Sequence, residues 1–294
     1  MNDLLTRYGV WLTVIFGALT AFWLLALVIL PDLYLFENSF RPYLPMVEMG
    51  GAKDFYSLDN YLTFFRSSIH VQVFFATIVY SSVVTVLCFV IAYPLAYYLA
   101  KVARGNIVPT LFLLLLIPLW VSEILRAFAW FIILALKGPL NFALTGLGII
   151  DQPIRWMTGF RSVIVGLVYT YVLFMLFPLY NAIQSLDTNQ IEAAEDLGSP
   201  WWRTHWRVIL PHSKPGIASG AVMVFMLSAG SILVPTLLAS TSSRWFTEII
   251  QQWMFESQDW NTGSAYAFLL LLLCTFFVSV VMRLFRVKLS DIAK

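Results

Sequence analysis

Long apolar runs alternate with short polar segments along this chain. A helix needs about 20 mostly apolar residues to cross roughly 30 Å of hydrocarbon, and six of the runs reach that length. We therefore predict an all-α membrane protein with six transmembrane helices. The predicted spans cover residues 10–30, 71–99, 107–135, 162–184, 217–239 and 265–285.

Prolines interrupt several of these spans. Residues 107–135 would rise over about 40 Å as one straight helix, and Pro118 lies inside the run without an N–H to donate. We predict a kink or break between residues 116 and 120, and similar interruptions at Pro94, Pro178 and Pro235. In a bilayer, neighbouring helices or a wet cavity must satisfy the freed carbonyls, so the pattern favours a protein with a path or a hinge.

The composition agrees with a bilayer protein, because 60% of the residues are hydrophobic, 12% are charged and the mean hydropathy is +0.80. A net charge of +2 with scattered positive residues argues against a nucleic-acid partner. Cys88 and Cys274 each lie in an apolar run and are interpreted as small hydrophobic residues. His70, His205 and His212 lack metal-ligand spacing and are interpreted as loop residues, so no metal site is predicted.

Six spans place both termini on one side of the membrane. The basic connections at 100–106 and 283–288 and the mildly acidic segment 31–69 favour cytoplasmic termini. A signal peptide is the alternative for residues 10–30, but the apolar run is too long and lacks a small-x-small cleavage site. We therefore predict an N-terminal transmembrane helix at 10–30, an external loop at 31–69 and a cytoplasmic loop at 186–215.

The loop at 186–215 is the longest polar interruption in the second half of the chain. Asp187 can cap a helix whose first turn contains Gln190, a spacing like that of a capping box. Residues 191–197 are good helix formers, and Gly198 then ends the helix. This part of the loop is predicted to be a short capped helix.

A second short helix is predicted directly after it. Ser199 and Pro200 suit the N-cap and first helical position. Trp202, Trp206 and Ile209 recur at i, i+4 and i+7, which places them on one apolar face. We predict a helix, a glycine turn and a helix that lie against the inner face of the membrane.

The first helix of the loop carries an unusual surface. Ala193 and Ala194 leave one side almost without bulk, beside the carboxylates of Glu192, Glu195 and Asp196. Such a surface can enter a groove of another protein closely. The alternative is a solvated amphipathic hairpin on the lipid headgroups.

The same residues belong to a longer pattern with fixed spacing. It consists of Glu192-Ala193-Ala194, three residues, Gly198, nine residues and Val208-x-Leu210-Pro211. This pattern resembles the EAA signature of ABC importer permeases, in which the last part is Ile-x-Leu-Pro. Val208 in place of Ile keeps a β-branched apolar side chain.

The resemblance extends from about residue 58 to the last span and points to the spermidine/putrescine permease group. It implies a type I ABC importer permease fold with one transmembrane domain over 1–294 and a core at 58–285, in the bacterial inner membrane. It also implies a second homologous permease, a dimer of ATPase subunits and an external solute-binding protein as partners. Supporting segments are Leu58-Asp59-Asn60-Tyr61, Ile117-Pro118-Leu119-Trp120, Leu125-Arg126, residues 148–154, Gly166-Leu167-Val168-Tyr169 and Asp259-Trp260.

The chain lacks the G-x-x-x-x-G-K-[ST] phosphate loop and contains no Gly-Lys pair. We therefore expect a non-catalytic permease without its own cofactor, with ATP and Mg²⁺ bound by the partner ATPase. The resemblance implies that the short helix in the loop at 186–215 docks on that ATPase. The residues implied in coupling are Glu192, Ala193, Ala194, Glu195, Asp196, Gly198, Leu210 and Pro211.

Glu123 and Arg126 are the charges nearest the membrane interior, where ionisable groups are candidates for function. At i and i+3 they suit a neutralising ion pair, and Glu123 alternatively suits attraction of a cationic substrate. Aromatic faces bind ammonium groups, so Trp120, Tyr171 and Trp260 join them as candidates for the substrate path.

The solute itself stays open at this stage. Ser231 and Thr236 stand where some polyamine permeases have acidic residues, so an opine, a betaine or an amino-acid derivative is an alternative to a polyamine. From another class, a secondary transporter or channel has similar broken helices but no need for the EAA pattern. No G-x-S-G, H-E-x-x-H or paired-Asp pattern supports an enzyme embedded in the membrane.

Overall fold

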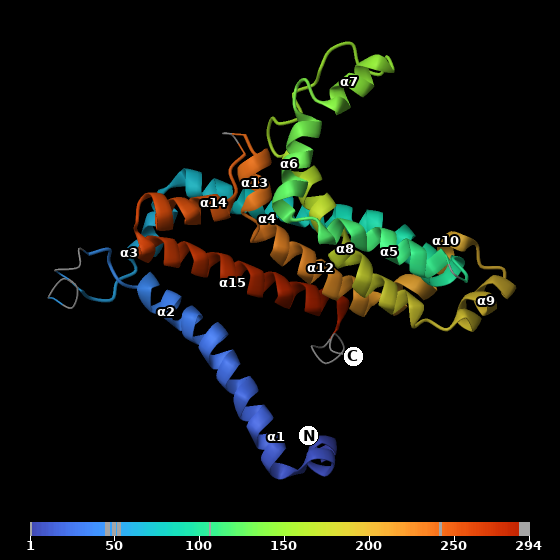
Figure 1. Cartoon of the computed structure of the whole chain (residues 1–294), viewed down its shortest axis with the longest axis horizontal. Coiled ribbons are helices and arrows are strands. Elements are labelled where there is room, and N and C mark those ends of the chain that lie inside the picture. The colour runs from blue at the N-terminus through green and yellow to red at the C-terminus, as the bar shows by residue number, and fades with distance from the viewer. Residues whose placement is uncertain are drawn as a thin grey trace. The chain divides into compact units, whose positions relative to one another are not determined.

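The computed structural model describes residues 2–44, 48, 51, 54–105, 107–240 and 243–287, and every regular element in this part of the chain is a helix (Figure 1). The chain divides into two compact units. The first comprises Met1–Ser67 and Ile250–Leu269, and the second comprises Ser68–Ile249 and Leu270–Lys294. The last long helix, α15 (Trp260–Phe285), belongs to both, and the last two residues of the short helix α14 (Phe246–Gln251) fall in the first unit.

In the first unit, the end of α2, the short α3 and the start of α15 are joined by buried polar contacts. The Asn60 amide donates to the carbonyls of Ser39 and Arg41, both at 2.9 Å, and Thr262 donates to the Asn60 amide oxygen at 3.4 Å. The elements of this unit, besides α15, are α1 (Asn2–Leu24), η1 (Leu25–Ile29), α2 (Leu30–Ser39), α3 (Asp59–Arg66) and η4 (Gln252–Glu256).

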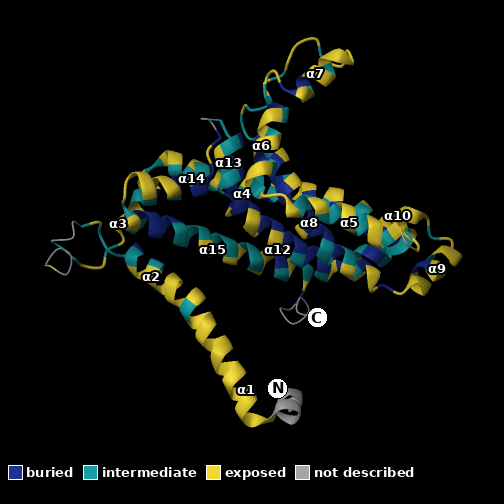
Figure 2. Cartoon of the chain, viewed as in Figure 1, coloured by how far each residue is buried: buried dark blue, intermediate teal, exposed yellow. Residues whose placement is uncertain are grey.

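The N-terminal helix is longer than predicted. Helical structure continues from Gly9 to Ser39, and the π-helical turn η1 directly precedes α2, in whose first turn Pro31 lies. Together with α3 this corrects the prediction of a loop over 31–69, although residues 45–47, 49, 50, 52 and 53 lie outside the described part. No residue in the most apolar stretch of this helix is buried, and Figure 2 shows it as exposed. Its apolar side chains are therefore available to lipid.

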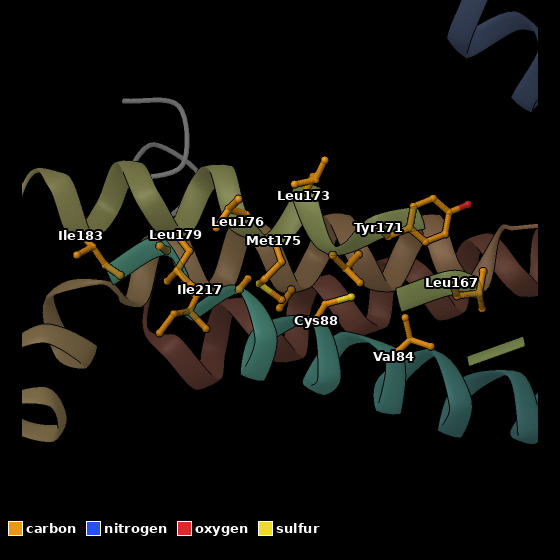
Figure 3. Packing of buried hydrophobic residues seen from close by; sticks show 14 of the residues in the cluster. Val84, Cys88, Leu167, Tyr171, Leu173, Met175, Leu176, Leu179, Ile183 and Ile217 are labelled. Carbon is orange, nitrogen blue, oxygen red and sulfur yellow. The ribbon is translucent and has the colours of Figure 1, made fainter. Parts of the chain in front are cut away.

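The core of the second unit is formed by α4, α8 and α12. Figure 3 shows Val84 and Cys88 of α4 facing Leu167, Met175 and other buried residues of α8. The elements of this unit, besides α15, are α4 (Ser68–Tyr97), η2 (Tyr98–Val102), α5 (Ile107–Trp120), α6 (Glu123–Leu134), α7 (Pro139–Gly146), α8 (Arg161–Gln184), α9 (Thr188–Asp196), α10 (Trp201–Thr204), η3 (His205–Ile209), α11 (Leu210–His212), α12 (Lys214–Ala229), α13 (Leu233–Leu238) and α14 (Phe246–Gln251).

Glycines let α12 approach α8 closely. A Cβ on Gly216 would lie 2.5 Å from the Ala182 Cβ and from the Pro178 carbonyl oxygen. A Cβ on Gly220 would lie 2.6 Å from the Met175 sulfur. The predicted close packing at Gly216-x-x-x-Gly220 is therefore confirmed, as expected for small residues between membrane helices.

Five helices in the described residues are long and apolar enough to cross a membrane: Gly9–Ser39, Ser68–Val102, Glu123–Gly146, Arg161–Gln184 and Trp260–Phe285. The predicted count of six spans is not confirmed. The predicted span at 107–135 is divided between α5 and α6, and the predicted span at 217–239 contains the shorter helix α12.

The break in the third predicted span lies at Val121–Ser122, just beyond the expected interval. A second break occurs at Gly230–Ile232, between α12 and α13. The expected interruptions at Pro94, Pro178 and Pro235 are wrong, since α4, α8 and α13 continue through them. At Pro94 the missing N–H leaves the Val90 carbonyl without its helical donor, and α4 nevertheless continues to Tyr97, where the π-helical turn η2 follows.

The connection between α6 and α8 is held by one buried side chain. Asn141 of α7 is 2% exposed and donates to the carbonyls of Leu136 (3.1 Å) and Ile154 (2.9 Å). Its amide oxygen accepts from the Ile154 N–H at 3.1 Å and from the Trp156 indole at 3.0 Å. These bonds fix α7 against the segment that leads to α8.

Candidate functional site

The loop after α8 begins with a capped helix, as the sequence predicts. The Asp187 carboxylate accepts from the backbone N–H of Asn189 at 3.0 Å, and α9 follows over Thr188–Asp196. The capping bond therefore goes to the second residue of the helix rather than to Gln190. The Gln190 N–H donates instead to the backbone carbonyl of Asp187 at 3.1 Å.

A glycine in the left-handed region ends α9. Gly198 has φ of 76°, its N–H donates to the Glu195 carbonyl at 2.8 Å, and the N–H of Ser199 donates to the Ala194 carbonyl at 3.0 Å. These two bonds form a Schellman motif, which satisfies the last carbonyls of the helix. Nothing lies within 4 Å of the position of a Cβ on Gly198, so the backbone angle rather than local crowding calls for glycine here.

The surface of α9 divides into an anchored side and a free side. Ile191 is 7% exposed and belongs to the cluster of buried residues around α4 and α8. Leu197, at the tip, is 88% exposed and was not singled out from the sequence. The remaining predicted coupling residues of α9 and its turn are exposed except Ala194, which is half-buried: Glu192, Ala193, Ala194, Glu195, Asp196 and Gly198.

The second helix of the loop starts one residue later than predicted, with Pro200 as its N-cap, and contains the π-helical turn η3. The predicted common face of Trp202, Trp206 and Ile209 is wrong. The two indoles are 50% and 70% exposed, whereas Ile209 is fully buried. A π turn adds a residue to the helix and rotates Ile209 away from the tryptophans toward the core.

The end of this helix is fixed by Ile209 and its neighbours. Leu210 is half-buried and packs against the core cluster, and Pro211 is exposed in the first turn of α11. Ser213 is fully buried, and its hydroxyl donates to the Ile209 carbonyl at 2.8 Å. The Leu-Pro end of the pattern therefore lies in the anchored segment that connects the loop to α12.

None of the three histidines is a loop residue, which corrects the interpretation from the sequence: His70 lies in α4 and His212 in α11. His205 lies in η3, its Nδ1 shares a hydrogen bond of 2.6 Å with the Tyr93 hydroxyl, and its ring packs edge-on against Tyr97 with centroids 4.6 Å apart. Burial lowers the pKa of His205, because it disfavours the charged imidazolium. Tyrosines on α4 gave no signal in the sequence that they would meet this histidine.

A second candidate site is a cavity of about 260 Å³ between α6, α8 and α12–α13. Glu123 and Tyr171 line it, and the Tyr171 hydroxyl donates to the Glu123 carboxylate at 3.1 Å. Ser231 lies in the same wall, is 6% exposed, and its hydroxyl has no hydrogen bond of standard geometry. The other lining residues are Met226, Leu227, Gly230, Ile232 and Leu233.

The other predicted path residues lie elsewhere. Glu123 and Arg126 form no ion pair within 4 Å, and the only salt bridges found among the described residues join Arg41 to Glu37 and to Asp54. The expected neutralising pair is thus wrong, because Tyr171 takes up the carboxylate. The Nε of Arg126 is buried without a hydrogen-bond partner. Trp120 is 89% exposed, and Trp260 packs edge-on against Phe255 in the first unit.

The fold and the loop define a class of protein. A family model described as "Binding-protein-dependent transport system inner membrane component" matches residues 89–290, so the chain belongs to this family of ABC importer permeases. Its apolar helices make it a multi-pass inner-membrane protein.

Within this family the chain is similar to spermidine/putrescine transport system permease proteins PotB. It is 33% identical over 274 residues to the protein of Salmonella typhimurium, covering 92% of this chain and 94% of that one. It is 35% identical over 243 residues to the protein of Escherichia coli K12, covering 83% and 86%.

Solved structures show the same fold at low sequence identity. A chain from the structure of a bacterial alginate ABC transporter, in complex with an alginate pentasaccharide-bound periplasmic protein, matches with a TM-score of 0.75 at 18% identity over 98% of this chain and 99% of that one. A chain of the MetNI methionine transporter in an inward-facing conformation matches with a TM-score of 0.56 at 20% identity, over 74% and 94%.

Proposed function

We propose that this chain carries a polyamine such as spermidine or putrescine inward as one permease subunit of an ATP-driven importer. The observation that carries the proposal is the 33% to 35% identity to spermidine/putrescine permeases over more than four fifths of the chain. An anionic side chain in the cavity between α6, α8 and α13 adds support, since polyamines are cations.

Under this proposal α9 is the contact with the ATPase. Its carboxylates and alanines are exposed, while Ile191 and Ile209 fix the loop to the helix core. Glu192 would meet a basic or N–H donor in a cleft of the ATPase, and Leu197 would fill an apolar site beside it. Closure of two ATPase subunits around ATP would then move the permease between inward-facing and outward-facing states.

The remaining partners follow from the family. The importer would contain a second homologous permease, two ATPase subunits that bind ATP and Mg²⁺, and an external solute-binding protein. Loop 186–215 and both termini would lie on the cytoplasmic side, where the ATPase has access to nucleotide. The alginate-transporter structure contains a periplasmic protein, which supports a partner of that kind.

Glu123 is the residue proposed to meet the cargo. Its carboxylate is held by Tyr171, and the Ser231 hydroxyl in the same wall makes no hydrogen bond of standard geometry. An ammonium group of a polyamine would donate to both the carboxylate and the hydroxyl while its methylene chain lies along Met226 and Leu233.

A different small solute, such as an opine, a betaine or an amino-acid derivative, is the second candidate. Ser231 and Thr236, neutral where some polyamine permeases are acidic, favour it. The structural neighbours show only that this fold serves transporters of chemically unlike compounds, alginate and methionine.

Purification of the tagged chain with its partners, followed by uptake in proteoliposomes, tests the proposal. An ATPase and a second permease should co-purify, and labelled putrescine or spermidine should enter only with ATP and the binding protein. Glu123→Gln should reduce uptake about tenfold or more, whereas Glu256→Gln, at an exposed carboxylate, should not. ATP-dependent uptake of a betaine but not of a polyamine would reject a polyamine as the transported solute, while the role as a permease subunit of an ATP-driven importer would stand.

A further inference from the structure

The loop that contains α9 is fastened to a helix that is not its neighbour in the sequence. Covalently it joins α8 to α12. Two polar contacts also tie it to the end of α4 and to η2. Lys101 donates to the Leu186 carbonyl at the start of the loop and to the Gln184 carbonyl at 3.4 Å. His205, in the second helix of the loop, shares the 2.6 Å bond with Tyr93.

Aromatic packing strengthens the second contact. The Tyr97 ring meets the His205 ring edge-on at 4.6 Å, and the Trp201 ring meets it from within the loop at 5.8 Å. Tyr93 and Lys101 are eight residues apart, which is about 12 Å along a helix. The loop is thus held at two points along one stretch of α4 and η2, rather than through a single flexible hinge.

The same helix reaches a segment far from the loop. Helix α4 is continuous from Ser68 to Tyr97, and the fully buried Thr77 accepts from the backbone N–H of Phe246 at 3.0 Å. Thr77 and Tyr93 are separated by about 24 Å of helix. Movement of the loop along α4 would therefore reach residues 245–249, on the side of the core away from α9.

We propose that α4 transmits the movement of α9 across the membrane, and that His205 and Tyr93 form the contact through which it does so. This inference rests on the proposed role of α9 as the ATPase contact. His205 is here a positioning residue, because it acts through α4 and touches no substrate. Both contacts coincide with π-helical turns, η2 and η3, which often mark functional positions in helices.

The test compares uptake with ATP hydrolysis in proteoliposomes that contain the complete importer. Tyr93→Phe removes only the hydroxyl and leaves the ring packing, so complex yield should be normal. We expect two- to tenfold less putrescine imported per ATP hydrolysed, which is the range for one hydrogen bond. Tyr98→Phe, one turn further along and 43% exposed, is the matched control and should leave the ratio unchanged.

Substitutions of His205 sharpen the comparison. Asn can place an amide atom near the position of Nδ1, so His205→Asn should retain most of the coupling, whereas His205→Ala should lose at least as much as Tyr93→Phe, because it also removes the ring contacts with Tyr97 and Trp201. The double variant Tyr93→Phe with His205→Ala should lose no more than His205→Ala alone, because that change already removes the shared bond. Additive losses would overturn the assignment of a shared contact.

A covalent replacement provides an independent measurement. If α4 and η3 move together, an importer with cysteines at positions 93 and 205 should hydrolyse ATP with reduced uptake while both thiols are free. A short bifunctional reagent that joins the two cysteines should restore the coupling of uptake to hydrolysis. Cross-linking that stops transport would refute joint movement. Equal losses of uptake and hydrolysis in Tyr93→Phe would also refute it, because they indicate a merely structural contact.

The outcome is separable from the proposed function. If the wild-type importer hydrolyses no ATP, or if no ATPase co-purifies, the proposed function as a subunit of an ATP-driven importer is refuted. If wild type and Tyr98→Phe transport normally while Tyr93→Phe imports as much solute per ATP as they do, only the role of α4 fails.

Discussion

Substitutions at Gly198 separate two reasons for a glycine at the end of α9. The residue has φ of 76°, a region in which an L side chain costs about 1–2 kcal/mol. No atom of this chain lies within 4 Å of a Cβ placed there, so Gly198→Ala introduces backbone strain without a clash inside the chain. A loss of about 1 kcal/mol reduces the population of the native turn relative to alternatives by about fivefold.

The identity of the new side chain sets the expected order. Asn tolerates the left-handed region, so Gly198→Asn should have the smallest effect, Gly198→Ala an intermediate one and the β-branched Gly198→Val the largest. Gly198→Asp should disrupt coupling beyond its backbone strain, because it adds a charge beside Glu195 and Asp196. The Schellman bonds from Gly198 and Ser199 are the local structure at risk.

The assay is stimulated ATP hydrolysis and uptake by the complete importer, normalised to the amount of ATPase that co-purifies. Backbone strain predicts the order Asn, Ala, Val of increasing loss. If Gly198→Asn is as damaging as Gly198→Val, the partner surface excludes any Cβ, and the requirement for glycine is close approach between subunits rather than φ. That result would refute the explanation from the turn.

Three further predictions follow from the packing. Gly216→Ala places a Cβ 2.5 Å from Ala182 and should destabilise the α8–α12 pair by about 1–3 kcal/mol in thermal unfolding in detergent, whereas Gly146→Ala, with nothing within 4 Å, should not. Asn141→Ala leaves the Trp156 indole and the Ile154 N–H without their acceptor, costs about 1–3 kcal/mol, and should speed proteolytic cleavage of residues 136–160. The pKa of His205 is lowered by burial, so the unfolded chain binds the proton more readily; stability should be full at pH 7 and fall below about 6.5, and His205→Asn should reduce this dependence in melting curves.

Features governed by local chemistry were accessible from the sequence. The cap at Asp187 and the turn at Gly198 depend on residues within one or two turns, and both occur as predicted apart from the partner of the cap. The break near Pro118 is also local, although it falls at Val121–Ser122. Hydropathy located four of the long helices, and most of their predicted ends lie within a few residues of the observed ends. The reason is that burial in lipid depends on composition along the segment.

Features that depend on distant residues were not accessible. The bond between His205 and Tyr93 joins positions 112 residues apart, and no periodicity marks either residue as a partner of the other. The expected pairing of Glu123 with Arg126 failed for the same reason, since Tyr171, 48 residues away, holds the carboxylate. Ile209 was wrongly placed on the face of Trp202 and Trp206, because a π turn shifts the helical phase that i, i+4 reasoning assumes.

The two helix breaks lie beside the cavity that contains Glu123. Glu123 follows the break at Val121–Ser122, and Gly230, Ser231 and Ile232 are the other break. Broken helices free carbonyls that neighbouring helices or a wet cavity must satisfy inside a membrane. Helices α8 and α12 pack closely at Gly216, and both also line the cavity, through Tyr171, Met226 and Leu227. Helix α4 contributes no lining residue, so a displacement of α4 would reach the cavity through this pair, which would connect the proposed ATPase contact to the proposed solute site.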